Sequence, residues 1–229
     1  MYYNYYAELI MKKLNPFITF IVLLLSTATA FSQASISSGI SYGSFSYDNS
    51  GTKYNGDGAV IHLDGQLATS ISFSATMSDG KFDNQVLSNN EGSITYNVYP
   101  NIGVYVMSSK IKVATVKDAT TSLGFSYSIN SPALGLKAFV GSFTDDYGKF
   151  YTYGTNIDLG VAKGTSLILS YKTEDRKQKA TTMDARFVYD LSSNLGLNLG
   201  YKSTETKDAN GSAVVLKGNT TYAGIVYRF

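Results

Sequence analysis

The sequence predicts an all-β fold, a closed antiparallel barrel of about 12 strands. Three observations support this prediction. Apolar and polar side chains alternate through most of the chain, short turns separate pairs of alternating segments, and the final residues form an aromatic strand. Because a strand has a side-chain period of two, each alternating segment has one apolar and one polar face.

The N-terminal segment is expected to be a leader that is removed. A short basic region at 11–13 precedes an almost wholly apolar run at 17–25, and residues 26–30 (STATA) supply a small-residue cleavage site. The alternative is a membrane anchor, but the apolar run is shorter than the roughly 20 residues that a spanning helix needs. The pattern therefore favours a cleaved signal peptide.

These features divide the chain into three parts. Residues 1–10 (MYYNYYAELI) fit no signal-peptide pattern, so we expect Met11 to be the true start and the first ten residues to be a gene-calling artefact. The signal peptide is expected at 11–33, and the barrel at 34–229.

The alternation marks the strands in order. The first is expected near Ile36–Tyr47, where the apolar parity shifts between Tyr42 and Phe45 and suggests a β-bulge or a loose start. At 102–113 both parities carry apolar residues, so its faces stay unassigned and a barrel of 10 strands stays an alternative. Clear alternation also marks segments 59–67, 71–77, 151–161, 167–171, 183–191, 195–201 and a last strand at 215–229.

The closing strand carries a family resemblance. One face of residues 222–229 is formed by Ala223, Ile225, Tyr227 and Phe229. This segment resembles the closing strand of bacterial outer-membrane β-barrels, in which a Gly, an aromatic residue and a terminal Phe form an assembly signal. Gly224, Tyr227 and Phe229 match that signal, whereas Tyr222 stands where a more polar residue is usual. The resemblance implies the barrel assembly machinery as a partner.

The resemblance extends to porin-type proteins of Gram-negative bacteria over nearly the whole of 34–229, although no motif indicates a subfamily. It implies a transmembrane barrel in the cell outer membrane, in contact with outer-membrane lipid, with short periplasmic turns and longer extracellular loops. Short turns are expected near 68, 100–101, 130–132, 162–164 and 192–194. Longer polar connections are expected at 48–57, 78–92, 110–120, 144–149, 174–179 and 203–212.

Composition agrees with this class. The chain has no Cys, so a disulfide-rich exported scaffold is excluded. Its formal net charge is only +2, which offers no electrostatic footprint for nucleic acid. A mean hydropathy of -0.05 is what alternating lipid-facing and lumen-facing residues should average to.

Aromatic residues on the apolar parity are expected to form a girdle at each membrane interface. Those expected near the short-turn rim are Tyr96, Tyr99, Tyr189, Tyr227 and Phe229, and those expected toward the long-loop rim are Tyr47, Tyr153, Tyr171 and Tyr201.

The polar face indicates the function. It consists mainly of Ser, Thr, Gly and Asn, and a barrel of about 12 strands lined by small side chains should leave a narrow aqueous passage. We therefore expect a channel for passive diffusion of small hydrophilic solutes. A non-conducting structural or surface-recognition barrel, or a lumen closed by an inserted loop, is the alternative. The pore-lining candidates are His62, Asp64, Lys137, Asn156, Asp158, Lys172, Asp184, Arg186, Asn198 and Lys202.

Catalytic chemistry is not expected. The sole histidine, His62, lies on the polar parity of its segment, where a lone His is usually a hydrogen-bonded lining residue. The sequence contains no carboxylate pair, metal-ligand spacing or phosphate-binding loop, so no cofactor or metal is expected.

One hairpin permits a register prediction. With Ser193 at the centre of its turn, Asp184 faces Lys202 and Arg186 faces Gly200. The missing side chain at Gly200 would let Arg186 reach Asp184, giving a charged cluster near the extracellular mouth. Because the inward basic and acidic residues nearly balance, only weak ion discrimination is expected.

Overall fold

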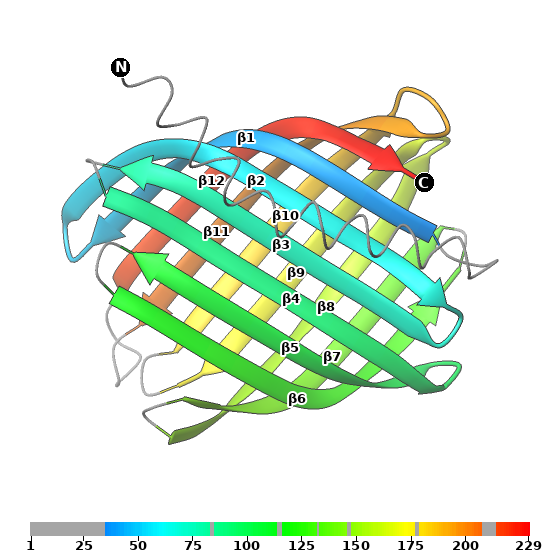
Figure 1. Cartoon of the computed structure of the whole chain (residues 1–229), viewed down its shortest axis with the longest axis horizontal. Coiled ribbons are helices and arrows are strands. Elements are labelled where there is room, and N and C mark those ends of the chain that lie inside the picture. The colour runs from blue at the N-terminus through cyan, green and yellow to red at the C-terminus, as the bar shows by residue number, and fades with distance from the viewer. Residues whose placement is uncertain are drawn as a thin grey trace, which may run out of the picture.

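The computed structural model describes residues 35–82, 85–113, 116–131, 133–145, 148–176, 179–207 and 214–229 as a closed antiparallel barrel of 12 strands (Figure 1). The strands are β1 (Ser35–Asn49), β2 (Thr52–Ala68), β3 (Ile71–Phe82), β4 (Gln85–Tyr99), β5 (Ile102–Val113), β6 (Val116–Asn130), β7 (Leu134–Asp145), β8 (Gly148–Ala162), β9 (Thr165–Asp175), β10 (Ala180–Asp190), β11 (Leu195–Lys207) and β12 (Val214–Arg228). The expected signal peptide lies outside the described residues. Among the described residues no helix is long and apolar enough to cross a membrane.

Each strand pairs with its neighbours in sequence, and β1 pairs with β12 to close the ring. The closing ladder runs from Ser37 opposite Arg228 to Asn49 opposite Leu216. We call the rim at Ser37 and Arg228 the terminal rim, and the rim at Asn49 and Leu216 the distal rim. Closure matters because it pairs the backbone groups that an open sheet would leave free at its edges.

The outer face carries the apolar residues. Large outward side chains are exposed on strand after strand, for example Ile94 and Tyr96 on β4, Leu123 and Phe125 on β6, and Leu199 on β11. Above this band, toward the distal rim, outward positions become polar or charged. An apolar band with polar margins is the pattern of a barrel whose outer surface faces lipid.

The aromatic residues expected in the girdles are also outward and exposed, with one exception. Tyr47 lines the interior cavity instead. The prediction that Tyr47 belongs to a girdle is wrong, because Tyr47 follows the inward Phe45 by two residues on β1 and therefore points inward as well.

The connections at the distal rim are shorter than the sequence predicts. The connection expected at 48–57 is a two-residue turn, Ser50-Gly51, and the polar residues on either side continue as paired strand. Both turn residues have positive φ, 51° and 93°, as in the tight turns that match strand twist. Segment 78–92 is likewise mostly strand, in β3 and β4. The change from apolar to polar side chains along these strands marks the edge of the apolar band. The strands themselves continue beyond that edge, because their backbones stay paired.

The two segments that resisted assignment are regular strands. β1 pairs without a register shift on both sides, so the expected bulge is wrong: Tyr42 points outward and Phe45 inward. The stretch 102–113 is the single strand β5, which settles the count at 12. Both of its parities are apolar because Tyr105 points inward while Val106 points outward.

Candidate functional site

The barrel encloses one large cavity of about 1210 Å³, to which every strand contributes lining residues. The lining reaches from Ser37 and Arg228 at the terminal rim to Arg176 and Thr206 near the distal rim. On β3 the inward residues are Ser74, Thr76 and Ser78, whose small side chains leave space in front of the wall. The cavity therefore extends along the barrel from one rim toward the other.

Of the ten pore-lining candidates, nine line this cavity: His62, Asp64, Lys137, Asn156, Asp158, Lys172, Asp184, Arg186 and Lys202. The tenth, Asn198, is only 1% exposed and lies within the wall. Its Oδ1 accepts a hydrogen bond of 3.1 Å from the Ser41 hydroxyl. In the ladder Gly224 lies between these two residues, so the bond from β1 to β11 crosses over a position without a side chain.

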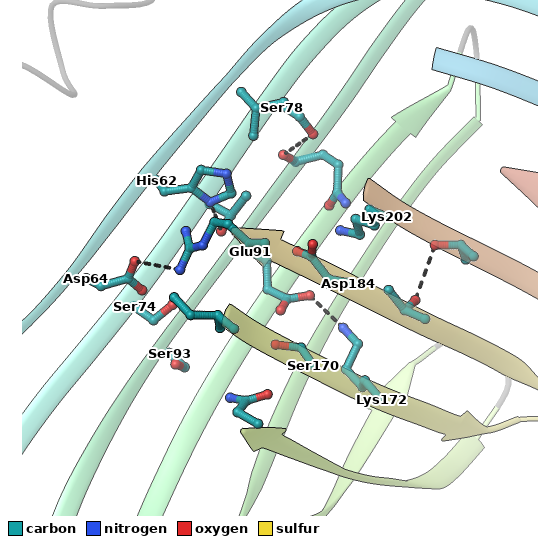
Figure 2. Close-up of a pocket in the computed structure, with 18 of the residues that line it drawn as sticks. His62, Asp64, Ser74, Ser78, Glu91, Ser93, Ser170, Lys172, Asp184 and Lys202 are labelled. Carbon is teal, nitrogen blue, oxygen red and sulfur yellow. Dashed lines mark hydrogen bonds and ion pairs between the residues drawn. The ribbon is translucent and has the colours of Figure 1, made fainter. Parts of the chain in front are cut away.

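An ion pair joins opposite walls of the cavity. The Lys172 ammonium on β9 donates to the Glu91 carboxylate on β4 at 2.6 Å. These strands are five apart in a ring of 12, so the contact spans the lumen rather than a strand boundary (Figure 2). The side chains are 17% and 34% exposed, and partial removal from water strengthens their attraction.

The cationic end of this bridge continues along its own wall. Lys172 also lies 3.5 Å from a Glu174 carboxylate oxygen, and Glu174 accepts a contact of 2.9 Å from Arg176. Arg176 in turn lies over the ring of Phe143 at 5.0 Å from its centroid. Lys172 is thus held between a carboxylate on its own strand and one from the facing wall.

Glu91 lines the cavity but is not among the residues that the sequence predicts to do so. It falls in segment 78–92, whose polar composition predicts a loop and therefore no residue facing the lumen. The parity of Ser93 and Thr95, continued back by one step of two, would have placed Glu91 on the inward face.

A second cationic side chain points across the cavity. Arg186 on β10 approaches Asp64 on β2 at 3.9 Å, over a distance of four strands in the ring. Figure 2 shows Asp64 at one side of the pocket, whereas Glu91 lies nearer to Asp184 and Lys202. The two bridges together narrow the middle of the lumen.

The predicted hairpin register is confirmed, because Asp184 pairs with Lys202 and Arg186 with Gly200. The predicted path for Arg186 is wrong. The ring of Tyr222, opposite Gly200 on β12, occupies the space that Gly200 leaves open. The Tyr222 hydroxyl donates to Asp184 at 3.1 Å, while Arg186 turns to Asp64. Since Glu91 is the seventh residue of the 15-residue β4, the narrowing lies inside the barrel and not at its mouth.

Inward aromatic residues thicken another part of the wall, on β5 to β8. Tyr105 and Phe139 meet edge to face with centroids 5.8 Å apart. Phe143 and Phe150 lie 5.5 Å apart closer to the distal rim. These rings reduce the free cross-section without adding charge.

His62 lies on the cavity wall among polar and aromatic side chains. Its Nδ1 lies 3.2 Å from the Thr76 hydroxyl, and its ring lies 5.6 Å from that of Tyr222. Within the described part of the chain, its Nε2 has no hydrogen-bonding partner. No group of His, Cys, Asp and Glu that could hold a metal ion occurs among the residues that the structure describes.

The residues of the expected assembly signal lie on the closing strand. Tyr227 and Phe229 are exposed on the outer face, with ring centroids 4.8 Å apart. Phe229 N–H donates to the carbonyl of Ile36 at 2.9 Å, so the end of the chain is tied to β1. Gly224 faces inward, where a Cβ would collide with the backbone of β1.

No protein-family model matches the sequence, and no curated protein does. Solved structures match it in fold. The NanC porin superposes with a TM-score of 0.56 at 9% identity, covering 82% of this chain and 98% of that one. The KdgM porin gives 0.53 at 12% identity, with 84% and 99% covered. A KdgM porin in complex with disordered oligogalacturonate gives 0.52 at 13% identity, with 83% and 99% covered. The chain is a closed barrel of 12 strands, and its fold is similar to that of these outer-membrane porins.

Proposed function

We propose that this protein is an outer-membrane channel through which small hydrophilic solutes diffuse passively. The observation that carries the proposal is the cavity of about 1210 Å³, whose lining extends from Ser37 and Arg228 at one rim to Arg176 and Thr206 near the other. A polar lining that reaches toward both ends of a closed barrel gives hydrated solutes a path through the membrane, which they cannot cross through the lipid around the outer apolar band.

The membrane placement is part of the proposal. The exposed apolar residues on the outer face would meet outer-membrane lipid, and the girdle tyrosines would lie at its interfaces. Gly224, Tyr227 and Phe229 would be read by the assembly machinery after export through the signal peptide. Ser35, the first described residue, and Phe229 both lie at the terminal rim, which would face the periplasm.

The lumen favours small solutes. The cross-lumen contacts of Lys172 and Arg186 narrow its middle, so a permeating solute must pass beside these pairs or part them. Basic and acidic side chains both line the cavity, and no ring of one sign is present among the described lining residues. Net discrimination between simple anions and cations should therefore be weak. No enzymatic activity is proposed.

A non-conducting barrel is the second candidate, and the same cross-lumen pairs favour it. If the Glu91–Lys172 bridge never parts, the space left beside it would be too narrow for hydrated solutes to pass. Such a barrel would act through its rims, as a structural or recognition protein.

Single-channel recording separates the two. The chain from residue 34 is refolded into detergent, its folding is checked by heat-modifiable mobility on a gel, and it is added to a planar bilayer. We expect discrete conductance steps, absent when protein-free detergent is added. A correctly folded barrel that gives no steps would favour the non-conducting candidate.

A further inference from the structure

Charge is unevenly distributed around the lumen. The cavity-lining residues of β9 to β11, together with the residue that follows β9, include four basic and two acidic side chains: Lys172, Arg176, Arg186, Lys202, Glu174 and Asp184. Glu174 is already bonded to Lys172 and Arg176 on this wall, and Asp184 accepts from Tyr222. This wall, which we call the basic wall, therefore has an excess of positive charge.

The facing wall has the opposite character. On β2 to β4 the cavity-lining charges are Asp64 and Glu91, and no Lys or Arg of these strands is among the described lining residues. The remainder of this acidic wall is mostly Ser and Thr, such as Ser74 and Thr76. An electric field therefore crosses the lumen from the basic wall to the acidic wall.

The field acts where two ion pairs cross the cavity. Glu91 contacts Lys172 at 2.6 Å and Asp64 approaches Arg186 at 3.9 Å, so both acidic residues meet the basic wall across the cavity. With side-chain exposures between 17% and 41%, these groups are only partly hydrated. Separating a pair without replacing its partner leaves a poorly solvated charge, which is costly.

Solutes differ in whether they can replace the partners of the separated charges. A simple anion can replace Glu91 at Lys172 but leaves Glu91 without a partner, and a simple cation does the reverse. A neutral solute replaces neither partner. A solute with an ammonium and a carboxylate a few ångströms apart replaces both partners at once and lies along the field.

We propose that the narrow part of the lumen is a binding site for small zwitterions of amino-acid size. The solute ammonium faces Asp64 and Glu91 of the acidic wall, and its carboxylate faces Lys172 and Arg186 of the basic wall. This inference rests on the proposed function in that it names the class of solute for which the channel has a preference.

Saturation-transfer difference NMR on the refolded barrel tests binding directly. Four probes of similar size are compared: 3-aminopropanoate, propanoate, propylammonium and propanamide. We expect the zwitterion to give a signal several-fold larger than each of the other three, and the difference to shrink in high salt because salt screens the site. Equal signals from all four probes would overturn the proposal.

Variants assign the signal to the two walls. Glu91→Gln and Lys172→Gln should each remove the advantage of the zwitterion, because one of its two charges loses its partner. The matched control is Glu205→Gln. Glu205 pairs with Lys217 at 3.4 Å, but the pair joins neighbouring strands and neither residue lines the cavity. This variant should keep the full advantage, and retention of the advantage in Glu91→Gln would overturn the proposal.

A double variant with inverted charges is the control in case the single-substitution variants fail to fold. Glu91→Lys combined with Lys172→Glu keeps the pair and reverses its direction. A small zwitterion can turn around, so the double variant should recover at least part of the preference that either single change removes. A double variant that folds but shows no preference would count against the proposal.

The failure of this inference can be told apart from failure of the proposed function. Saturation transfer requires access to the lumen from only one rim, whereas conductance requires passage through it. Zwitterion binding without conductance would reject the channel and keep the site. Conductance with equal signals from all probes would keep the channel and reject the site.

Discussion

The lumen and the outer face each hold an ion pair, and the two pairs differ in what they connect. Glu91 and Lys172 join β4 to β9 across the cavity, whereas Glu205 and Lys217 join β11 to β12, which their backbone ladder already holds together. The outer pair is also more exposed, at 39% and 50% against 34% and 17%. We therefore expect the cross-lumen pair to affect passage, whereas the stability of the barrel should depend on the backbone ladder and the close packing of neighbouring strands.

The largest effect is expected from Lys172→Ala. The substitution removes the cationic end of the bridge and leaves Glu91 and Glu174 facing the passage, so conductance should rise several-fold and the channel should favour cations. Single-channel conductance and the reversal potential in a salt gradient measure both effects. An unchanged conductance step would mean that the bridge does not limit passage.

Gly224→Ala tests the other half of the comparison. A Cβ at this position would overlap the Ile40 carbonyl and the Ser41 backbone and disturb the Ser41–Asn198 hydrogen bond above it. We expect a loss of about 1–3 kcal/mol in the free energy of unfolding, measured by urea titration. Ion preference should stay as in the unchanged protein, and a large change in selectivity would contradict the separation of roles.

A smaller effect on selectivity is expected from Lys202→Glu. Lys202 lines the basic wall beside Asp184, so reversal of its charge should shift the reversal potential toward cations. Water screens this part of the lumen, so stability should change by only about 0–1 kcal/mol. An unchanged ion preference would mean that Lys202 does not act on the permeating ions.

Glu205→Gln should have the smallest effect of all. An exposed pair between adjacent strands contributes about 0–1 kcal/mol, and these residues lie outside the cavity lining. Conductance, selectivity and the urea midpoint should all match those of the unchanged protein. A changed conductance would show that the outer face influences passage and would break the comparison.

The sequence by itself determined the class of fold and much of the wall, and it left a barrel of 10 strands as an alternative to the 12 that the structure has. A period of two assigns each residue of a regular strand to one face, and the turn at Ser193 set the pairing of Asp184 with Lys202 that the structure confirms. For the same reason nine of the ten inward candidates lie on the cavity lining. Parity and register are local properties, so residues close in sequence carry the information.

Tertiary structure decided where the strands end and which side chains meet across the lumen. Polar composition marked the margin of the apolar band, but the ladder continued through it, and Glu91 was hidden in a segment interpreted as a loop. Whether Arg186 would turn to Asp184 or to Asp64 depended on Tyr222, which comes from a strand 36 residues later and fills the space above Gly200. Contacts of this kind depend on the curvature of the closed ring, which brings together strands far apart in the chain, and no local periodicity encodes them.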